Sequence, residues 1–304
     1  MFSVSFGLFL THLLMEFLVP LIPGILLVWL LCGSKFKWFL LYVFGWFSWV
    51  GIVAFSMFNL QFLWAGIGLI QYAAIVVALI LWVLAIQKRR WHSMHALLET
   101  LRPCGRISCS EIKDIWNKHT KVERALVAIG GVYIVGRLAL TLAHVSTLPS
   151  YADDTFNNRN SPVINIFHDG GVKIFGEESE ILGRARLGYP IILPLYKSLL
   201  VTFMWTYNDI YVNLRQWISF FLFAVLVLHT TYTSSKNLLA TIVPGVLIMW
   251  LPLVFFHAVE WYFDLASAIY AYLVIRVLYE YLQTKDHSYV PLALVLASVL
   301  VYLK

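Results

Sequence analysis

The stretch RALVAIGGVYIVGRLALTLAHVS, residues 124–146, decides the class of fold. Its length is close to the roughly 20 apolar residues that an α-helix needs to cross about 30 Å of hydrocarbon. Comparable apolar runs occupy about 4–32, 38–58, 61–87, 214–233, 238–256, 265–283 and 288–303. The sequence therefore predicts an all-α protein, a polytopic membrane helical bundle of about eight transmembrane helices.

The composition supports the same class. Hydrophobic residues make up 61% of the chain and charged residues 12%, and the mean hydropathy is +0.79. Soluble domains average about 45–50% apolar and about 25% charged residues, which excludes an ordinary soluble protein. Within the overlong first run, Pro20 and Pro23 are expected to kink the helix, because a proline removes a backbone donor.

The distribution of charged residues predicts the orientation of the chain in the membrane. The loop 87–124 holds nine Lys and Arg residues and four acids. Positively charged loops stay in the cytoplasm, and Lys35 and Lys37, two crossings earlier, agree with that side. The N-terminus and the loop 147–189 are then expected outside an inner or plasma membrane. Because the net charge of +6 collects on this one loop, it bears on orientation and indicates no nucleic-acid partner.

The segment 187–212 leaves two topologies open. Its apolar core is short and is interrupted by Pro190, Pro194 and Lys197. We expect an amphipathic element at the outer interface, and hence an outer loop with juxtamembrane helices over 147–213.

That choice determines which side of the membrane each later loop faces. Lys236 and Lys285 then fall inside, and the segment 257–264 falls outside, so Asp264 shares a face with Asp153 and Asp154. Counting 187–212 as a span reverses these sides and obeys the positive-inside rule less well.

Two adjacent carboxylates, Asp153 and Asp154, follow closely after the span 124–146. Such a pair can bind a divalent cation through oxygen ligands, or one member can act as a general base. A solvated loop of mixed charge is the alternative. Arginine presents a bidentate fork to phosphate. The cations of this loop that suit a phosphate group are Arg159, Lys173, Arg184 and Arg186.

Four motifs follow one another in a suggestive order. They are DDTFNN after a span, HDGGVKIF, LGYPIILPLYKSLL and, two spans later, YFDLASAIYAYL. This order resembles the integral-membrane glycosyltransferases of the GT-C class, which include protein O-mannosyltransferases and aminoarabinose transferases. The match covers roughly 124–283, and it is carried more by order and spacing than by any single motif. Residues 1–123 gain no function from it.

The resemblance implies roles for residues of the outer face. Asp153 or Asp154, with a slight preference for Asp154, matches the acid that acts as catalytic base. A divalent metal ion, Mg²⁺ or Mn²⁺, is implied at Asp154 and Asp264. The substrate-binding residues that the resemblance and the loop charges together suggest are Asp264, Arg159, His168, Lys173, Arg184, Arg186 and Tyr189. Departures occur at Asn157, Asn158 and Ala266, and they leave the sugar undefined.

The implied function is transfer of a sugar from a polyprenyl-phosphate donor to a cell-envelope acceptor on the non-cytoplasmic face. Membrane lipid and a glycan, lipid or protein acceptor are the expected partners. The chain divides into an N-terminal three-span region, 1–123, with its basic loop, and a GT-C-like membrane core, 124–304. Relatives of this class commonly carry further spans and a C-terminal domain, so the resemblance is compatible with a longer chain.

Two other functions fit the residues. A transporter or flippase for a lipid-linked or anionic solute would use broken helices and intramembrane charges, such as Glu16 and Arg137. A non-catalytic membrane scaffold would need no shared cavity. Charges inside membranes usually face a partner, and we expect a structural pair between Glu16 and Arg137. His12 shares the helix face of Glu16, and Arg276 and Glu280 have the i,i+4 spacing of a helix-end pair.

Overall fold

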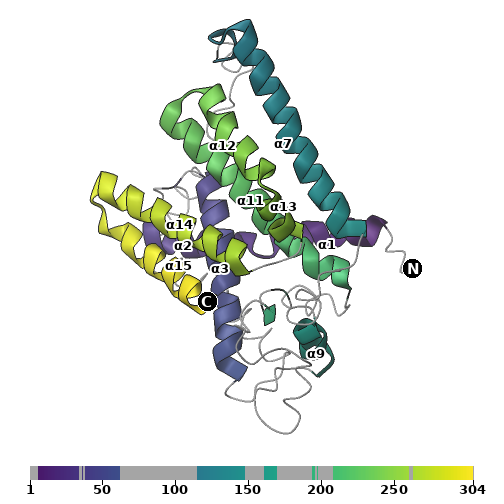
Figure 1. Ribbon diagram of the computed structural model, residues 1–304. Coiled ribbons are helices and arrows are strands. Elements are labelled where there is room, and N and C mark those ends of the chain that lie inside the picture. Colours follow the sequence, from purple (N-terminus) through teal and green to yellow (C-terminus); the bar gives the residue numbers. More distant parts are fainter. Residues whose placement is uncertain are drawn as a thin grey trace.

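The computed structural model describes eleven helical elements (Figure 1). It describes residues 6–33, 36, 38–61, 115–147, 161–169, 194–195, 197, 208–259 and 263–303. Within them, no strand occurs. The elements are α1 (Phe6–Leu18), α2 (Leu21–Cys32), α3 (Trp38–Gln61), α7 (Lys121–Thr147), α9 (Ser161–Asp169), α11 (Asp209–Ser235), α12 (Leu238–Trp250), α13 (Pro252–Val259), α14 (Phe263–Thr284), the 3₁₀ turn η4 (His287–Tyr289) and α15 (Val290–Tyr302).

The expectation of an all-helical bundle is confirmed, but the number of spans is lower than predicted. Among the described residues, four helices are long and apolar enough to cross a membrane, or five if the bent pair α12–α13 counts as one. The predicted span 38–58 lies within the 24-residue helix α3, in which the apolar stretch runs from Phe39 to Ala54, and the predicted span 288–303 corresponds to the apolar helix His287–Tyr302. Each of these two apolar stretches is shorter than the roughly 20 residues that a crossing needs. The predicted span 61–87 lies outside the described residues.

The first apolar run breaks where its prolines predicted. α1 ends at Leu18 and α2 begins at Leu21, on either side of Pro20. α2 then crosses α3 at two glycines. A Cβ added to Gly24 would lie 2.5 Å from the backbone of Gly45, and the reverse also holds. The missing side chains are therefore what lets these two backbones touch.

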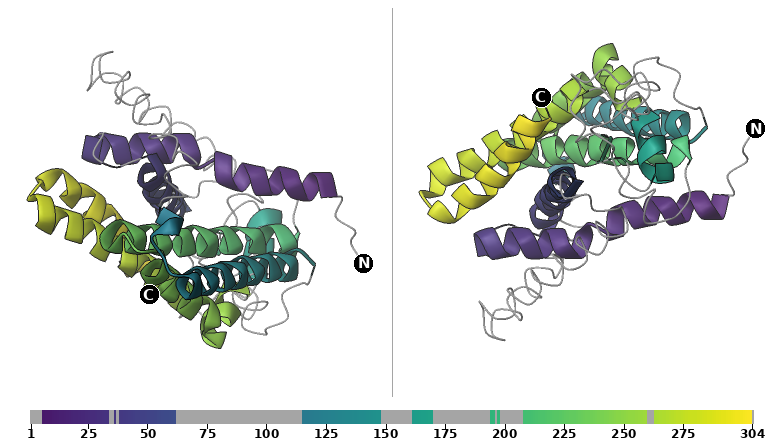
Figure 2. Two further views of the ribbon diagram at one scale, coloured as in Figure 1. Left: turned by 90° about the horizontal axis from the view of Figure 1, so that it is seen from above. Right: turned by 90° about the horizontal axis from the view of Figure 1, so that it is seen from below.

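α7, α11 and α12 lie side by side (Figures 1 and 2). At one level, the Trp217 indole of α11 donates to the Leu138 carbonyl of α7 at 3.0 Å. Farther from the end of α7, Gly130 approaches Ile242 of α12. α12 is parallel to α7, because Ile242 meets Gly130 and Met249 meets Arg137 farther along both helices. α11 is joined to α12 by the short turn 236–237 and packs against it, so it is antiparallel to both. The end of α7 and the start of α11 consequently lie at the same end of the bundle, as expected if 187–212 does not cross.

The predicted span 238–256 is a bent pair. α12 and α13 meet at 72° around Leu251. Pro252 has no N–H to bond to the Ile248 carbonyl, so the helical hydrogen bonds cannot continue there. The next carbonyl, that of Met249, faces α7. It accepts from Arg137 Nε at 3.2 Å and from the Tyr133 hydroxyl at 3.3 Å. The guanidinium also lies 4.0 Å from the centre of the Phe255 ring. Of the three glycines of α7, Gly130 alone packs closely against a neighbouring helix, whereas Gly131 and Gly136 face open space.

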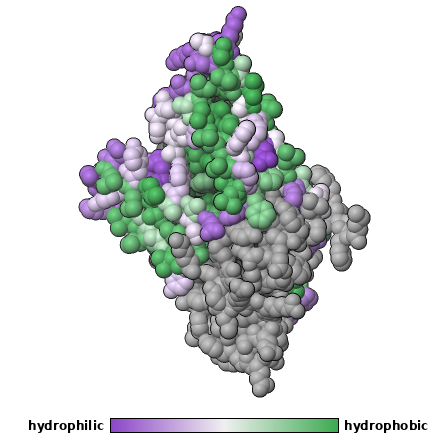
Figure 3. Space-filling model, viewed as in Figure 1, coloured by the Kyte–Doolittle hydropathy of each residue, from purple (hydrophilic) through white to green (hydrophobic). Residues whose placement is uncertain are grey.

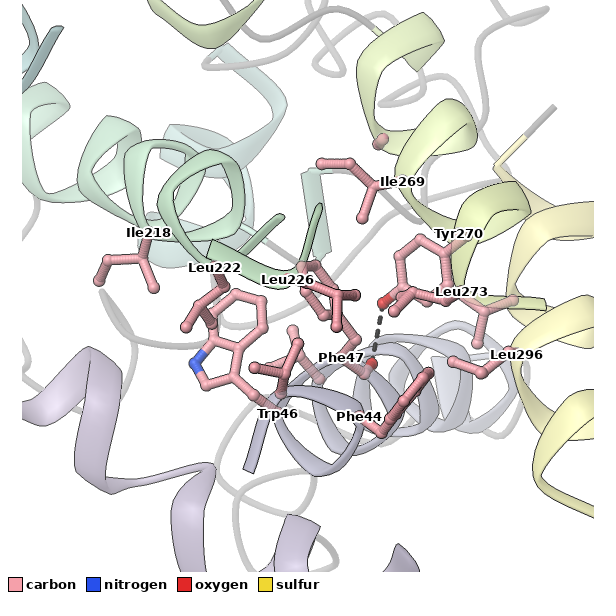
Figure 4. Packing of buried hydrophobic residues seen from close by; sticks show 14 of the residues in the cluster. Phe44, Trp46, Phe47, Ile218, Leu222, Leu226, Ile269, Tyr270, Leu273 and Leu296 are labelled. Atoms are coloured by element: carbon pink, nitrogen blue, oxygen red, sulfur yellow. Dashed lines mark hydrogen bonds between the residues drawn. The ribbon is translucent and has the colours of Figure 1, made fainter. Parts of the chain in front are cut away.

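The main hydrophobic core joins α3 to the later helices (Figure 4). The Tyr270 hydroxyl of α14 donates to the Phe47 carbonyl of α3 at 2.9 Å. Leu296 of α15 and Leu222 of α11 pack in the same cluster. The core therefore crosses the boundary expected near residue 123.

The outer surface of the α7–α12 part is strongly apolar (Figure 3). Hydrophobic side chains cover its flank, and hydrophilic ones gather at the tip where α7 begins. On α7, Val132 is 74% exposed and Ile129 is 66% exposed. Such a face needs an apolar surrounding, which suggests an integral membrane protein.

Candidate functional site

Two of the predicted site residues are described. His168, next to last in α9, is exposed with its ring 5.4 Å from that of Phe167. Asp264, in the first turn of α14, is exposed as well. The other predicted site residues lie outside the described residues; they are Asp153, Asp154, Arg159, Lys173, Arg184, Arg186 and Tyr189.

α9 packs against the start of α11. Val163 of α9 is completely buried with Val212 of α11, and Phe167 packs against the same pair. The helix that follows the Asp153–Asp154 segment by a few residues is therefore docked on the first turns of α11. That contact places α9 at the end of the bundle where α7 ends and α11 begins.

The next turns of α11 are polar and enclosed. Every side chain from Val212 to Phe220 is buried. We call residues 213–219 the polar turn of α11, because Asn213, Arg215, Gln216 and Ser219 all lie within it. Starting from Asp209, Arg215 lies about 9 Å along the helix axis, at about 1.5 Å per residue. Ionisable groups at such depth are uncommon and point to functional sites.

A buried lysine faces one side of the polar turn. Lys197 is 1% exposed, and its ammonium donates to Asn213 Oδ1 at 3.3 Å. Lys197 belongs to the LGYPIILPLYKSLL motif, where the sequence pattern offered it only as an interruption of an apolar run. Its burial was not predicted, because an element at the membrane interface would leave a lysine in water.

The opposite side of the polar turn holds a buried ion pair. Arg215 Nε and Nη2 lie 2.8–2.9 Å from the carboxylate oxygens of Glu16 in α1. Glu16 was expected to pair with Arg137, and that is wrong: Arg137 caps the broken α12 helix. Two other expectations about individual helices hold. His12 is buried on the same face of α1 as Glu16, and Arg276 pairs with Glu280.

The third side of the polar turn faces α13. Gln216 Nε2 donates to the His257 carbonyl at 3.2 Å, and Gln216 Oε1, although buried, accepts no hydrogen bond within the described part of the chain. Successive residues of an α-helix turn by about 100°. Asn213 and Gln216 therefore point to neighbouring sectors, and Arg215 points away from Asn213. Val212, which contacts α9, lies between them, about 100° from Asn213 and about 60° from Arg215, so α9 packs between the Lys197 contact and the Glu16–Arg215 pair.

This arrangement suits recognition of an anion. Lysine and an amide offer N–H donors, and burial strengthens their attraction for a negative group. The predicted metal site is not tested, because Asp154 lies outside the described residues; among the described residues, no three His, Cys, Asp or Glu side chains converge.

Comparisons with known proteins give no relative: no family model, curated protein or solved structure matches this chain. The residues that sequence analysis missed share one signal. Lys197 and Arg215 are lone cations inside or beside apolar runs, and Arg215 stands one residue after the predicted start of a span at 214. Taking every such cation as a site candidate would have found both.

Proposed function

We propose that this chain is a membrane glycosyltransferase of the GT-C type, which moves a sugar from a polyprenyl-phosphate donor to a cell-envelope acceptor. The proposal places the reaction on the non-cytoplasmic face. It also assigns the protein to the inner or plasma membrane. One observation carries it: α9, a few residues after the acid pair, docks on α11 at Val212, and the buried Lys197 binds Asn213, the next residue of α11.

The proposed reaction needs two groups. Asp154 or Asp153 accepts the proton of the acceptor hydroxyl, whose oxygen attacks the anomeric carbon of the sugar. The bond from that carbon to the phosphate oxygen breaks, and the polyprenyl phosphate leaves with the electron pair. Lys197 is proposed to stabilise the negative charge that develops on this leaving group, since a preorganised cation in a dry site is most effective there. Asp264 and the loop arginines complete the substrate contacts of the proposal.

The surroundings of this end of the bundle favour a lipid-linked sugar donor. The polar turn begins within about 9 Å of the helix start, so a phosphate at the membrane interface would lie near it. The exposed apolar flank of α7 offers a surface along which a polyprenyl chain can lie. A nucleotide-sugar donor would instead need a phosphate-binding motif, and neither a Gly-rich phosphate loop nor a dinucleotide-binding fingerprint occurs in the basic loop 87–124.

Transfer from radiolabelled polyprenyl-phosphate sugars, with the protein reconstituted in vesicles, tests the proposal. Asp153→Asn, Asp154→Asn and Asp264→Asn are compared with the wild type, and Glu178→Gln serves as a loop-acid control. Loss of the base should lower transfer by about 10²–10⁴-fold, because general-base catalysis contributes that much. Lys197→Gln should lower the rate with little change in expression. Undiminished transfer in all three Asp variants, or no transfer from any donor, would refute the mechanism.

A transporter of a lipid-linked or anionic solute is the second candidate. The breaks between α1 and α2 and between α12 and α13 favour it, because transporters bind solutes at broken helices. At both breaks, however, protein side chains already occupy the exposed carbonyls. Trp46 Nε1 donates to the Glu16 carbonyl at 3.0 Å, and Arg137 donates to that of Met249. Movement of the labelled lipid across sealed vesicles without sugar transfer would favour transport over the enzyme.

A further inference from the structure

The opposite end of the bundle holds a second, unrelated feature. An apolar pocket of about 430 Å³ lies where α7 begins, between Trp116, Phe39 of α3, Leu228 and Tyr232 of α11, and the start of α12 at Leu238. Its volume is within the range of about 300–1,000 Å³ typical of small-molecule sites. The proposed sugar transfer concerns the other end of α11, so this pocket has no part in it.

The pocket has an apolar interior. Of its polar lining residues, Thr241 donates its hydroxyl to the Asn237 carbonyl at 2.7 Å. The ring of His229 lies 4.9 Å from that of Phe39, centre to centre. Phe39, Trp116, Val225 and Leu228 supply carbon surface. The occupant should therefore be a hydrocarbon group.

Local hydrogen bonds hold the walls of the pocket in place. Thr120 and Glu123 form a reciprocal capping box at the start of α7: Thr120 N donates to the carboxylate at 2.8 Å, and Glu123 N donates to the Thr120 hydroxyl at 3.2 Å. Arg124 then ties down the turn that carries Trp116, because it donates to the carbonyls of Asn117 and His119 at 3.0 Å and 2.9 Å. The pocket is preformed, which lowers the entropic cost of binding.

Positive charge surrounds the pocket. Lys236 Nζ lies 5.8 Å from the centre of the Tyr232 ring, which is part of the lining. Lys118 follows Trp116 by two residues, and Lys121 opens α7; all three lysines are exposed. Among the described residues, the nearby acid is Glu123, which is engaged by Thr120 and by His119 at 3.5 Å. The charges at the mouth therefore favour an anionic head group.

The surface beside the pocket changes from charged to apolar. The hydrophilic tip at the start of α7 adjoins the hydrophobic flank (Figure 3). Val122 is 70% exposed, and Val243 of α12 is 50% exposed. In a chain that spans a membrane, such a change is expected where lipid head groups meet acyl chains. Basic pockets between membrane helices on the cytoplasmic side recognise anionic phospholipids in this way.

We propose that this pocket binds one acyl chain of an anionic phospholipid, whose head group contacts Lys236 and Lys118. Hydrocarbon lining, preformed walls and a basic mouth together fit this occupant. A second copy of the chain or a peptide helix fits less well, because a helix is about 10–12 Å across with its side chains. The experiments below distinguish these two occupants from a phospholipid.

Native mass spectrometry of the full chain in mild detergent tests the proposal. Phosphatidylglycerol and phosphatidylcholine with the same acyl chains are titrated separately. Wild type should retain phosphatidylglycerol preferentially. Lys236→Gln should lower that retention about fivefold, since a lysine near an anionic surface contributes that much, and Lys118→Gln should act similarly.

The chain offers a matched control. Lys285 has the same left-handed backbone as Lys236, with φ of 53° and 52° respectively. Both lysines are exposed just after a long helix, but Lys285 does not line or adjoin the pocket as described. Lys285→Gln should leave phosphatidylglycerol retention unchanged. An equal loss in both variants would overturn the head-group assignment.

A second measurement locates the acyl chain. A phosphatidylglycerol with brominated chains should quench Trp116, so Trp116→Phe should remove that part of the quenching at stoichiometric lipid. Val225→Trp should fill the pocket and lower retention of both lipids. Equal retention of the two lipids by wild type, quenching unchanged in Trp116→Phe, or a dimer in lipid-free detergent that Val225→Trp abolishes would each overturn the proposal.

Discussion

Arg215 binds both carboxylate oxygens of Glu16 at 2.8–2.9 Å, across 199 positions of sequence. The pair is enclosed: Glu16 is fully buried, and Arg215 is 3% exposed. Trp46 secures the same turn of α1 through the Glu16 carbonyl. This contact joins α1 to α11 and holds the first helix against the polar turn.

Breaking this pair by one substitution should be costly. Glu16→Gln or Arg215→Met leaves one charge buried without its partner, and we expect a loss of about 3–5 kcal/mol in the free energy of unfolding. Glu16→Leu combined with Arg215→Met should recover much of it. Glu280→Gln, in a local i,i+4 pair, should cost only about 0.3–0.5 kcal/mol. Thermal unfolding in detergent measures all four, and equal shifts for Glu16→Gln and Glu280→Gln would contradict the prediction.

The crossing of α2 and α3 should tolerate no added methyl group. Gly24→Ala or Gly45→Ala places a Cβ 2.5 Å from backbone atoms, so the helices must separate. We expect a loss of about 1–3 kcal/mol, typical of overpacking. Gly131→Ala is the control, because nothing lies within 4 Å of its Cβ position, and alanine favours helix there by up to about 1 kcal/mol. A lower melting temperature for Gly131→Ala than for Gly24→Ala would count against the crossing.

The break between α12 and α13 depends on two donors from α7. Arg137→Met or Tyr133→Phe removes one of the two hydrogen bonds to the Met249 carbonyl, at about 0.5–1.5 kcal/mol each. The double variant leaves that carbonyl without either donor, so its loss should exceed the sum of the single losses. Tyr279→Phe, on an exposed ring of α14, should change little. Strict additivity in a double-mutant cycle would show that the two donors do not share the carbonyl.

The two ends of the bundle should face opposite sides of the membrane. In a background that lacks Cys32, Cys104 and Cys109, Asp264→Cys should react with an impermeant maleimide from outside. Lys236→Cys should react only after the membrane is permeabilised, because the positive-inside rule places it with the loop 87–124. Labelling of both positions from the same side would remove the shared outer face of the proposed reaction.

Local features of the structure were accessible from the sequence. The apolar runs predicted helices, Pro20 predicted the break after α1, and the spacing of Arg276 and Glu280 predicted their contact. Each of these depends on residues within one or two helical turns, where backbone geometry alone sets the neighbours. Helix starts follow the same rule: Asn208 and Asn237 cap α11 and α12 with their side-chain oxygens.

Contacts between distant segments depended on packing. The sequence shows that Glu16 and Arg137 each need a partner, but only the placement of α1 against α11 selects Arg215 for Glu16 and leaves Arg137 for the Met249 carbonyl. The burial of Lys197 and the bend at Leu251 were decided in the same way. The physical reason is that helix propensity and hydropathy act within a segment, whereas the partner of a buried polar group is set by which helices approach each other.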